Sequence, residues 1–457
     1  MARLLSLGER AVKLAVKLGA TEAEAYLSQT AQNLLTFHEK IESGKASQLT
    51  GIGVRAIVDK RIGFASSSFA ELGDIENTAK MAVSIAKASQ VDSDWPSLPK
   101  RAGRAKVVGT FDKRTAEIET DTLVRKAVEV IDFVRDCDSR LALARGNLTT
   151  GVVTCAIVNS HGSELSKRGT YASFSIRVKA EDAGKKGTSD EGWQARSWKE
   201  IEFEKLTDEA SKRAIEMLDA SQIPNTKASV IFAGDLFAQI LNVMFTRTIN
   251  AEAVQKGRSP WIGKIGQQIA HDNFDVVDDG TMKSGFMSWG FDDEGVPQQP
   301  TAVIQKGVLK SYLYDTYTGA KDKAASTGNA TRRGMGMFGL ANPYTRTPTP
   351  APTNFVLKPG DAERDEMIEE TQEGLYVVTS IGEWLSNPMS GMLNATVTNA
   401  FLVKNGELSN PVKGVIVSGS FFDMIRNTID LIADDTRNAA NFYSPSVRVR
   451  EMSIAGR

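Results

Sequence analysis

The sequence is poor in the residues that carry most metal and nucleophile chemistry. It has three histidines, at positions 38, 161 and 271, and two cysteines, at 137 and 155. The histidines stand far apart, and none belongs to an HExxH or HExxxH motif. The cysteines form no CxxC pair, which indicates a reducing compartment and no structural disulfides. This scarcity argues against a metal centre or a thiol nucleophile built by this chain alone.

The sequence also has no strong excess of charge and no long apolar run. Its formal net charge is −1, so no overall field favours nucleic acid or an anionic membrane. No stretch approaches the roughly 18 apolar residues of a membrane span. Glu9, Arg10 and Lys13 interrupt the N-terminal segment, which therefore does not resemble a signal peptide. We expect a soluble, cytoplasmic protein that binds neither nucleic acid nor membrane.

Other catalytic motifs are missing as well. The chain has no GxSxG elbow and no GxxxxGK[ST] phosphate loop. Residues 334–339 match GxGxxG by letters, but no clear strand precedes them and no helix follows, so we interpret the match as chance. Cys155 lies in the apolar run VVTCAIV, a context typical of a buried and inert thiol.

The periodicity of apolar residues predicts an α+β fold that begins with a region of helices and antiparallel sheet at 1–225. This region divides into two helix-and-sheet units, 1–95 and 115–225. The stretch between them contains prolines and a basic run, and we interpret it as a solvated linker. Helical spacing recurs in segments 3–18, 74–88, 120–135 and 204–218.

The second domain, 226–457, is rich in strands and glycine. Its pattern predicts a curled antiparallel sheet over a helix, close to a partial barrel. Lys404–Glu407 (KNGE) is the strongest hairpin signal in the chain, and 421–433 has helical spacing.

A predicted strand-to-helix turn at Gly234 opens this domain. Apolar positions follow helical spacing after a β-like run at 229–233, and Asp235 is well placed to cap the helix. The positions expected on its exposed face hold neither imidazole nor carboxylate; they are Gln239, Asn242, Thr246 and Arg247.

Charged side chains gather in two glycine-rich loops of the same domain. The loop 290–300 carries Asp292, Asp293 and Glu294, and the loop 326–334 carries Arg332 and Arg333. Acids and arginines in such loops could bind the backbone or termini of a peptide, or a partner. The alternative is loop solvation and pairing between strands. Exposed strand edges could also accept an extended peptide as an added strand.

Several of these segments together resemble the TldD/PmbA family, also called peptidase U62 or modulators of DNA gyrase. The resemblance spans nearly the whole chain, and its most specific part is the stretch that begins SGFMSWGFDDEGVPQQP. The segments that carry it are 51–68, 158–175, 284–332, 401–428 and 446–456.

The resemblance implies two sister types of subunit. In the TldD type, the helix after the first strand of the C-terminal domain carries HExxxH, and a late cysteine completes a zinc site. Aligned with that motif, the two histidine positions fall on Asn242 and Arg247 and the glutamate position on Val243, and no cysteine follows Cys155. The chain therefore resembles the TldE/PmbA type, which lacks the zinc motif.

That resemblance implies a catalytically silent subunit of a heteromeric metalloprotease acting on unfolded peptides or small proteins. No cofactor is expected in this chain, and zinc is expected in a TldD-type partner. Two alternatives stay open. One is a stand-alone hydrolase that uses His161 or His271 with the acids at 292–294. The other is a homodimer that binds peptides without a protease partner.

Overall fold

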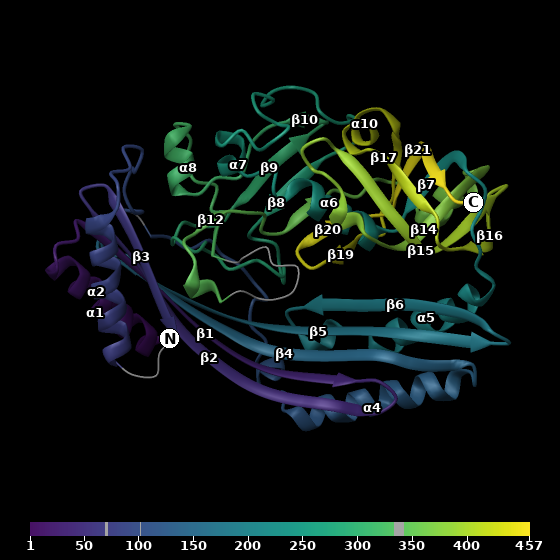
Figure 1. Cartoon of the computed structure of the whole chain (residues 1–457), viewed down its shortest axis with the longest axis horizontal. Helices are drawn as coiled ribbons and strands as arrows, with labels where there is room; N and C mark the ends of the chain where they lie inside the picture. The colour runs from purple at the N-terminus through teal and green to yellow at the C-terminus, as the bar shows by residue number, and fades with distance from the viewer. Residues whose placement is uncertain (69–71, 101, 333–341) are drawn as a thin grey trace.

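The computed structural model describes residues 1–68, 72–100, 102–332 and 342–457. Arg333 and the GxGxxG letters at 334–339 lie outside these residues. Figure 1 shows a long curved sheet with helices along its outer side, and a strand-rich body that faces the inner side of the sheet. No helix in the described ranges combines the length and apolarity needed to cross a membrane.

The N-terminal sheet is antiparallel and contains strands from both predicted units. Its spatial order is β3-β2-β1-β4-β5-β6, so β1 and β4 join the two units at the centre. Each unit contributes one meander of three strands, and the two meanders extend outward from β1 and β4 in opposite directions. The strands are β1 (Glu22–Phe37), β2 (Ile41–Val58), β3 (Arg61–Ser68), β4 (Leu141–Asn159), β5 (Glu164–Asp182) and β6 (Lys185–Ala195).

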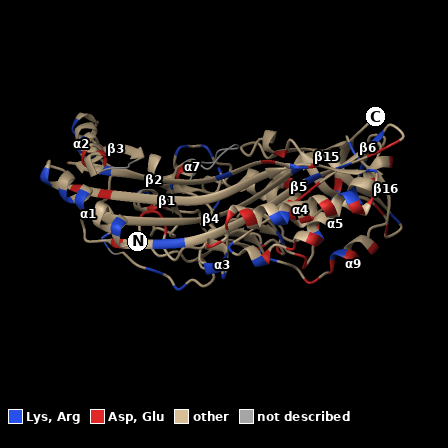
Figure 2. Cartoon of the chain, turned by 90° about the horizontal axis from the view of Figure 1, so that it is seen from below, with Lys and Arg blue, Asp and Glu red and all other residues tan. Residues whose placement is uncertain are grey.

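Amphipathic helices cover the outer side of this sheet. α1 (Ala2–Lys17) and α2 (Leu72–Ala88) pack at one end, and α4 (Thr120–Cys137) and α5 (Phe203–Glu216) pack at the other. The segments predicted to be helical from their spacing are therefore confirmed, within two residues at each end. Figure 2 shows charges of both signs along α4 and α5, as expected for their solvated sides.

The alternation of side chains along β1 decides what each side of the sheet meets. Ala25 and Leu27 point to the outer side and are buried with α1 and α2, whereas Leu35 is buried with α4 farther along. The even-numbered residues of β1 point to the inner side, because successive side chains of a strand alternate. Glu24 and Tyr26 are thereby directed at the C-terminal domain.

The linker between the units runs along the C-terminal domain and is not solvated throughout. Backbone N–H groups of Gly103 and Ala105 donate to the carbonyls of Gly295 and Gly290. Trp95 and Leu98 are buried. The predicted solvated linker is thus wrong in part, because its backbone is bonded to a loop that is distant in sequence. The short helix α3 (Lys113–Ala116) spans the end of the linker and the start of the second unit.

The C-terminal domain contains a closed barrel. Five strands pair in the order β14-β7-β21-β17-β15, and β15 pairs back with β14 to complete the ring. The expected curled, partial-barrel sheet is confirmed, and the sheet in fact closes. The expectation of a purely antiparallel sheet is wrong, because β14 and β7 pair in parallel. The barrel strands and their extensions are β7 (Thr226–Phe232), β14 (Glu373–Ile381), β15 (Met392–Lys404), β16 (Glu407–Val412), β17 (Ile416–Ser420), β18 (Ile429–Ile432) and β21 (Val447–Ala455).

A second sheet and short helices complete this domain around the largest apolar core. The sheet has the order β10-β9-β8-β13-β20-β19. Its strands are β8 (Val276–Asp279), β9 (Pro300–Gln305), β10 (Val308–Leu309), β13 (Phe355–Leu357), β19 (Arg437–Ala439) and β20 (Phe442–Ser444), beside a small pair of β11 (Ala330–Thr331) and β12 (Thr349–Pro350). The helices are α6 (Gly234–Phe245), α7 (Ala251–Gln255), α8 (Thr316–Lys321), α9 (Arg364–Glu369) and α10 (Phe421–Asp423).

Two local predictions in this domain have opposite outcomes. The KNGE hairpin is confirmed, with Asn405 and Gly406 at positive φ between β15 and β16. The helix predicted over 421–433 is wrong in its second half. After α10 the chain makes one π-helical stretch, Met424–Thr428, and then continues as strand β18 paired with β21. Pairing with an existing barrel strand outweighs the helical spacing there.

Candidate functional site

Helix α6 is fixed at the centre of the C-terminal core. It starts where the backbone passes close to β20: a Cβ at Gly234 would lie 2.5 Å from the carbonyl oxygen of Ser444. Only glycine fits this approach. The side chains of Phe237, Ile240 and Leu241 are fully buried. The helix is therefore a rigid support, and the side chains at its C-terminal end are positioned by the core.

The end of α6 carries the residues aligned with a zinc motif. Asn242 and Val243 are half-buried in its last turn, and Arg247 is exposed in the turn beyond Phe245. The hydroxyl of Thr246 donates a 2.7 Å hydrogen bond to Oδ1 of Asn242. Thr246 was expected on the exposed face of the helix, but it is buried, because the chain turns back on itself after the helix ends.

This donor set does not fit a zinc ion. The three positions offer no imidazole, thiolate or carboxylate. They hold the Asn242 amide, which is already bonded to a hydroxyl, the Val243 side chain and the Arg247 guanidinium. Among residues in the described ranges, no group of three or more His, Cys, Asp or Glu side chains is arranged to hold a metal ion. We therefore assign no metal-dependent step to this chain.

Asp235 does not cap α6 as predicted. The N-cap residue is Ala233, which makes no side-chain cap bond, and Asp235 lies one residue inside the helix. Burial raises the pKa of its carboxyl, against the opposing effect of the nearby Arg437 and Arg213. The strand-to-helix turn is tighter than the sequence suggested, and this shifts the cap toward the strand.

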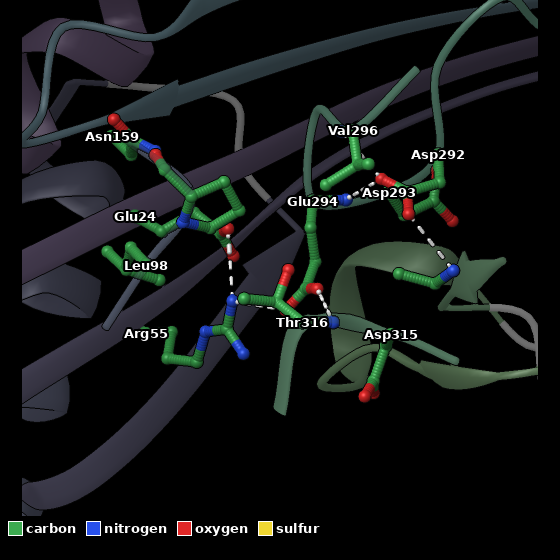
Figure 3. A network of polar contacts seen from close by, with 12 residues as sticks. Glu24, Arg55, Leu98, Asn159, Asp292, Asp293, Glu294, Val296, Asp315 and Thr316 are labelled. Carbon is green, nitrogen blue, oxygen red and sulfur yellow. Dashed lines mark hydrogen bonds and ion pairs between the residues drawn. The ribbon is translucent and has the colours of Figure 1, made fainter. Parts of the chain in front are cut away.

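The acids and the arginine predicted in loops form a buried ionic network between the two domains (Figure 3). Nη2 of Arg55 lies 3.1 Å from Oε2 of Glu24 and 3.0 Å from Oε1 of Glu294. The other guanidinium of the network, that of Arg332, pairs with Oε1 of Glu24. Arg332 is 1% exposed and Glu24 is fully buried, so water does not reach this pair.

A second part of the network involves strand β5. Nζ of Lys167 lies 2.8 Å from Oδ1 of Asp293, whose Oδ2 accepts from the backbone N–H of Arg332 at 2.9 Å. Asp292 instead accepts backbone N–H groups from its own loop and from Ala330. The loop 291–296 is thereby bonded both to the N-terminal sheet and to β11.

The pKa values divide these acids into two kinds. Burial raises the pKa of Asp293, but the Lys167 ammonium and its hydrogen bonds outweigh burial and lower it overall. Burial, followed by the charge of Glu294, raises the pKa of Asp292 well above its usual value. The same two causes, in the same order, raise the pKa of Asp315 to about 6. The network thus pairs some carboxylates with cations and favours the protonated form in others.

The network has little room for a ligand. A cavity of about 30 Å³ lies beside it, lined in part by Tyr26, Lys167 and Asp293. That volume holds about one water molecule. Asp292, Asp293, Glu294 and Arg332, which were candidates for peptide or partner binding, are all buried here. Their geometry favours a role in holding the two domains together.

The histidines are not brought to these acids. Nε2 of His161 lies 3.1 Å from Oε1 of Glu22 and 3.2 Å from the hydroxyl of Ser97, which itself donates to Glu22. A catalytic triad needs the acid and the hydroxyl on opposite ring nitrogens, whereas here both meet Nε2. His271 is exposed and bonded to Asn273. This geometry does not favour the stand-alone hydrolase.

The sequence reasoning missed three members of the network, Glu24, Arg55 and Lys167. A signal was present for the first two. Arg55 is the only charge in the segment GVRAIV, and Glu24 is the only charge in AEAYL, the apolar segment that follows Glu22. A charge at such a position must be paired when the strand is buried on both sides. Lys167 stands in the polar segment ELSKRG, where its burial has no such signal.

Comparison with known proteins agrees with this architecture. Three family descriptions match consecutive parts of the chain: PmbA/TldA metallopeptidase domain 1 at residues 23–86, the central domain at 113–218 and the C-terminal domain at 225–456. These matches cover most of the sequence. The chain belongs to the PmbA/TldD family.

Several known proteins are similar to this chain over most of its length. An uncharacterised protein of Methanocaldococcus jannaschii is 26% identical over 96% of this chain and 97% of its own length. A metalloprotease TldD homologue of Buchnera aphidicola is 26% identical over 87% of this chain and 82% of its own. The crystal structure of TldE from Thermococcus kodakarensis superposes with a TM-score of 0.88 at 20% identity, covering 98% of this chain and all of that one, and so shares the fold.

Proposed function

We propose that this chain is the non-catalytic, TldE/PmbA-type subunit of a heteromeric TldD-type zinc metalloprotease that acts on unfolded peptides or small proteins. The observation that carries the proposal is the end of α6. There the family fold is complete, while Asn242, Val243 and Arg247 provide no zinc ligand and no general base. Proteolysis would then occur on the partner's copy of this helix, and zinc would be held there.

An exposed apolar surface beside α6 supports a partner. The 3-10 turn Glu383–Leu385 lies against α6, in the connection between β14 and β15. Single exposed apolar residues are ordinary, but a cluster on one short connection is typical of an interaction surface. The cluster consists of Ile381 (49% exposed), Trp384 (48%), Leu385 (77%), Met389 (45%) and Met392 (49%).

The proposal is tested by zinc content and peptide cleavage. The chain is purified alone and with a family member that carries HExxxH, and each sample is analysed for bound zinc and for cleavage of an unfolded peptide. We expect zinc and cleavage only in the mixed sample. A control in which the partner's motif glutamate is replaced by glutamine should bind zinc without cleaving. Stoichiometric zinc with cleavage by the lone chain would contradict the proposal.

The mixed sample also decides the oligomeric state. Size-exclusion chromatography with light scattering should give a heterodimer. A stable dimer of this chain alone that ignores the HExxxH protein would favour the homodimeric peptide-binding protein instead.

A further inference from the structure

Strand β2 is much longer than β3, the edge strand that pairs with it. β3 pairs only with residues 51–58 of β2. Residues 41–50 are paired with β1 on one side. On their other side, no strand of the described residues lies next to them. Most residues of this segment are exposed. A free edge of ten residues is about 33 Å long.

The turn between β2 and β3 determines which backbone groups face outward. Asp59 and Lys60 both have positive φ, so the turn has two residues and makes Val58 and Arg61 a hydrogen-bonded pair. Even-numbered residues of β2 therefore direct N–H and C=O away from β1. On the free edge, past the bulge that sets Ser43 opposite Thr36 and Ile41 opposite Phe37, these residues are Gly44, Ala46, Gln48 and Thr50.

Natural sheets usually protect such an edge with charges, prolines or bulges. This edge, IESGKASQLT, has a bulge only at its first residues, opposite Thr36 and Phe37, and no proline. It has small residues at its centre and two charges, Glu42 and Lys45. A groove of about 350 Å³ lies across one face of β2, β1 and β4, next to residues 115–118. Its lining is uncharged and includes Ala46 and Gln48 from the edge strand. Uncharged, small side chains leave the backbone row accessible.

The chemistry of the edge selects its occupant. A row of alternating donors and acceptors at strand spacing is satisfied by another extended backbone, and not by a metal ion or an anion. A second copy of the same edge would offer the same row of groups, and protection of the edge at high chain concentration distinguishes it from a bound peptide.

We infer that the edge 41–50 of β2 binds an extended segment of unfolded polypeptide as an added strand. Recognition is through backbone hydrogen bonds, so it depends little on sequence. The inference rests on the proposed function, because it gives a chain without catalytic residues a part in holding the substrate.

The test uses the full chain without a partner, so it is independent of zinc and cleavage. The probe is a fluorescent, capped decapeptide of alternating Thr and Val, followed by anisotropy. Its control is the same peptide with alternate backbone nitrogens methylated. We expect saturable binding of the first and none of the second. In hydrogen exchange, segment 41–50 should become protected when the first peptide binds.

Two variants locate the site. Ala46→Pro removes an outward N–H and no bond to β1, and should weaken binding about tenfold. Ala46→Val keeps the N–H and should bind as the wild type does. The inference is overturned if the peptide does not bind, or if Ala46→Pro binds it equally well without new protection at 41–50. It is also overturned if the edge becomes protected without peptide at high chain concentration, because a second copy of the chain would then be its occupant.

Discussion

The guanidinium of Arg332 forms an ion pair with the carboxylate of Glu24, which stands 308 residues earlier in the chain. Neither side chain reaches solvent. Arg332 also lies 4.8 Å from the ring centre of Tyr26. This contact connects the inner side of the N-terminal sheet to β11 of the C-terminal domain. The two domains are therefore linked through charges whose separation would leave them buried and unpaired.

Arg332→Met should lower the free energy of unfolding by about 3 kcal/mol, because Glu24 keeps only Arg55 as its partner. Urea denaturation measures this. Arg247→Met, at an exposed arginine, is the control and should change stability by less than about 0.5 kcal/mol. Adding Glu24→Gln to Arg332→Met should recover part of the loss. Equal stability of the two single variants would show that the pair does not connect the domains.

The raised pKa of Asp315 predicts a dependence of stability on pH. Its pKa is about 6 in the folded protein and 3.8 for an unperturbed aspartate. Between pH 4 and pH 6 the folded state therefore binds more protons at Asp315 than the unfolded state does. The stabilisation from protonated Asp315 is complete below pH 4 and is lost as pH rises through 6. This difference between the two pKa values corresponds to about 2 to 3 kcal/mol in the free energy of unfolding.

Asp315→Asn isolates this effect. Oδ1 of Asp315 accepts from the N–H and hydroxyl of Thr318, and an asparagine oxygen can accept both bonds. The variant should become more stable relative to the wild type between pH 4 and pH 7. Denaturation curves at several pH values measure the difference. A constant difference across this range would mean that Asp315 titrates at its ordinary pKa.

The exposed apolar cluster at 381–392 should be needed for pairing with the TldD-type partner. Leu385→Asp should abolish co-elution and cleavage in the mixed sample, while the melting temperature of the lone chain stays unchanged. Met81→Asp is the matched control, since Met81 is 59% exposed on α2, away from this cluster. Loss of pairing in both variants, or in neither, would rule out this surface as the interface.

A pair of glycines in the first unit tests how closely the helices pack on the sheet. A Cβ at Gly63 would lie 2.2 Å from the carbonyl oxygen of Ala82 in α2, whereas one at Gly73 would meet nothing within 4 Å. Gly63→Ala should therefore cost about 1 to 3 kcal/mol. Gly73→Ala should be neutral or stabilise by up to about 1 kcal/mol, because alanine favours a helix. Thermal unfolding distinguishes them, and similar effects would mean that α2 can move away from β3.

The candidate site was only partly predictable from the sequence. The residues at the end of α6 were identified, since a helix after a short strand has a clear pattern and the absence of histidine is visible in the letters. The role of Asp292, Asp293 and Glu294 was not, because three consecutive acids beside glycine look like a solvated loop. Asp293 and Glu294 pair with Lys167 and Arg55, which come from strands more than a hundred residues away, and only folding brings these cations to them.

The sequence by itself determined the local elements. The spacing of apolar residues specifies the helices on the outer side of the sheet, and the Asn405–Gly406 turn specifies its hairpin, because each depends on neighbours in the chain. Tertiary structure decided what those neighbours cannot encode. It joined two units through β1 and β4, closed the barrel, and turned the end of the predicted helix at 421–433 into a strand, because backbone pairing across the fold outweighs local propensity.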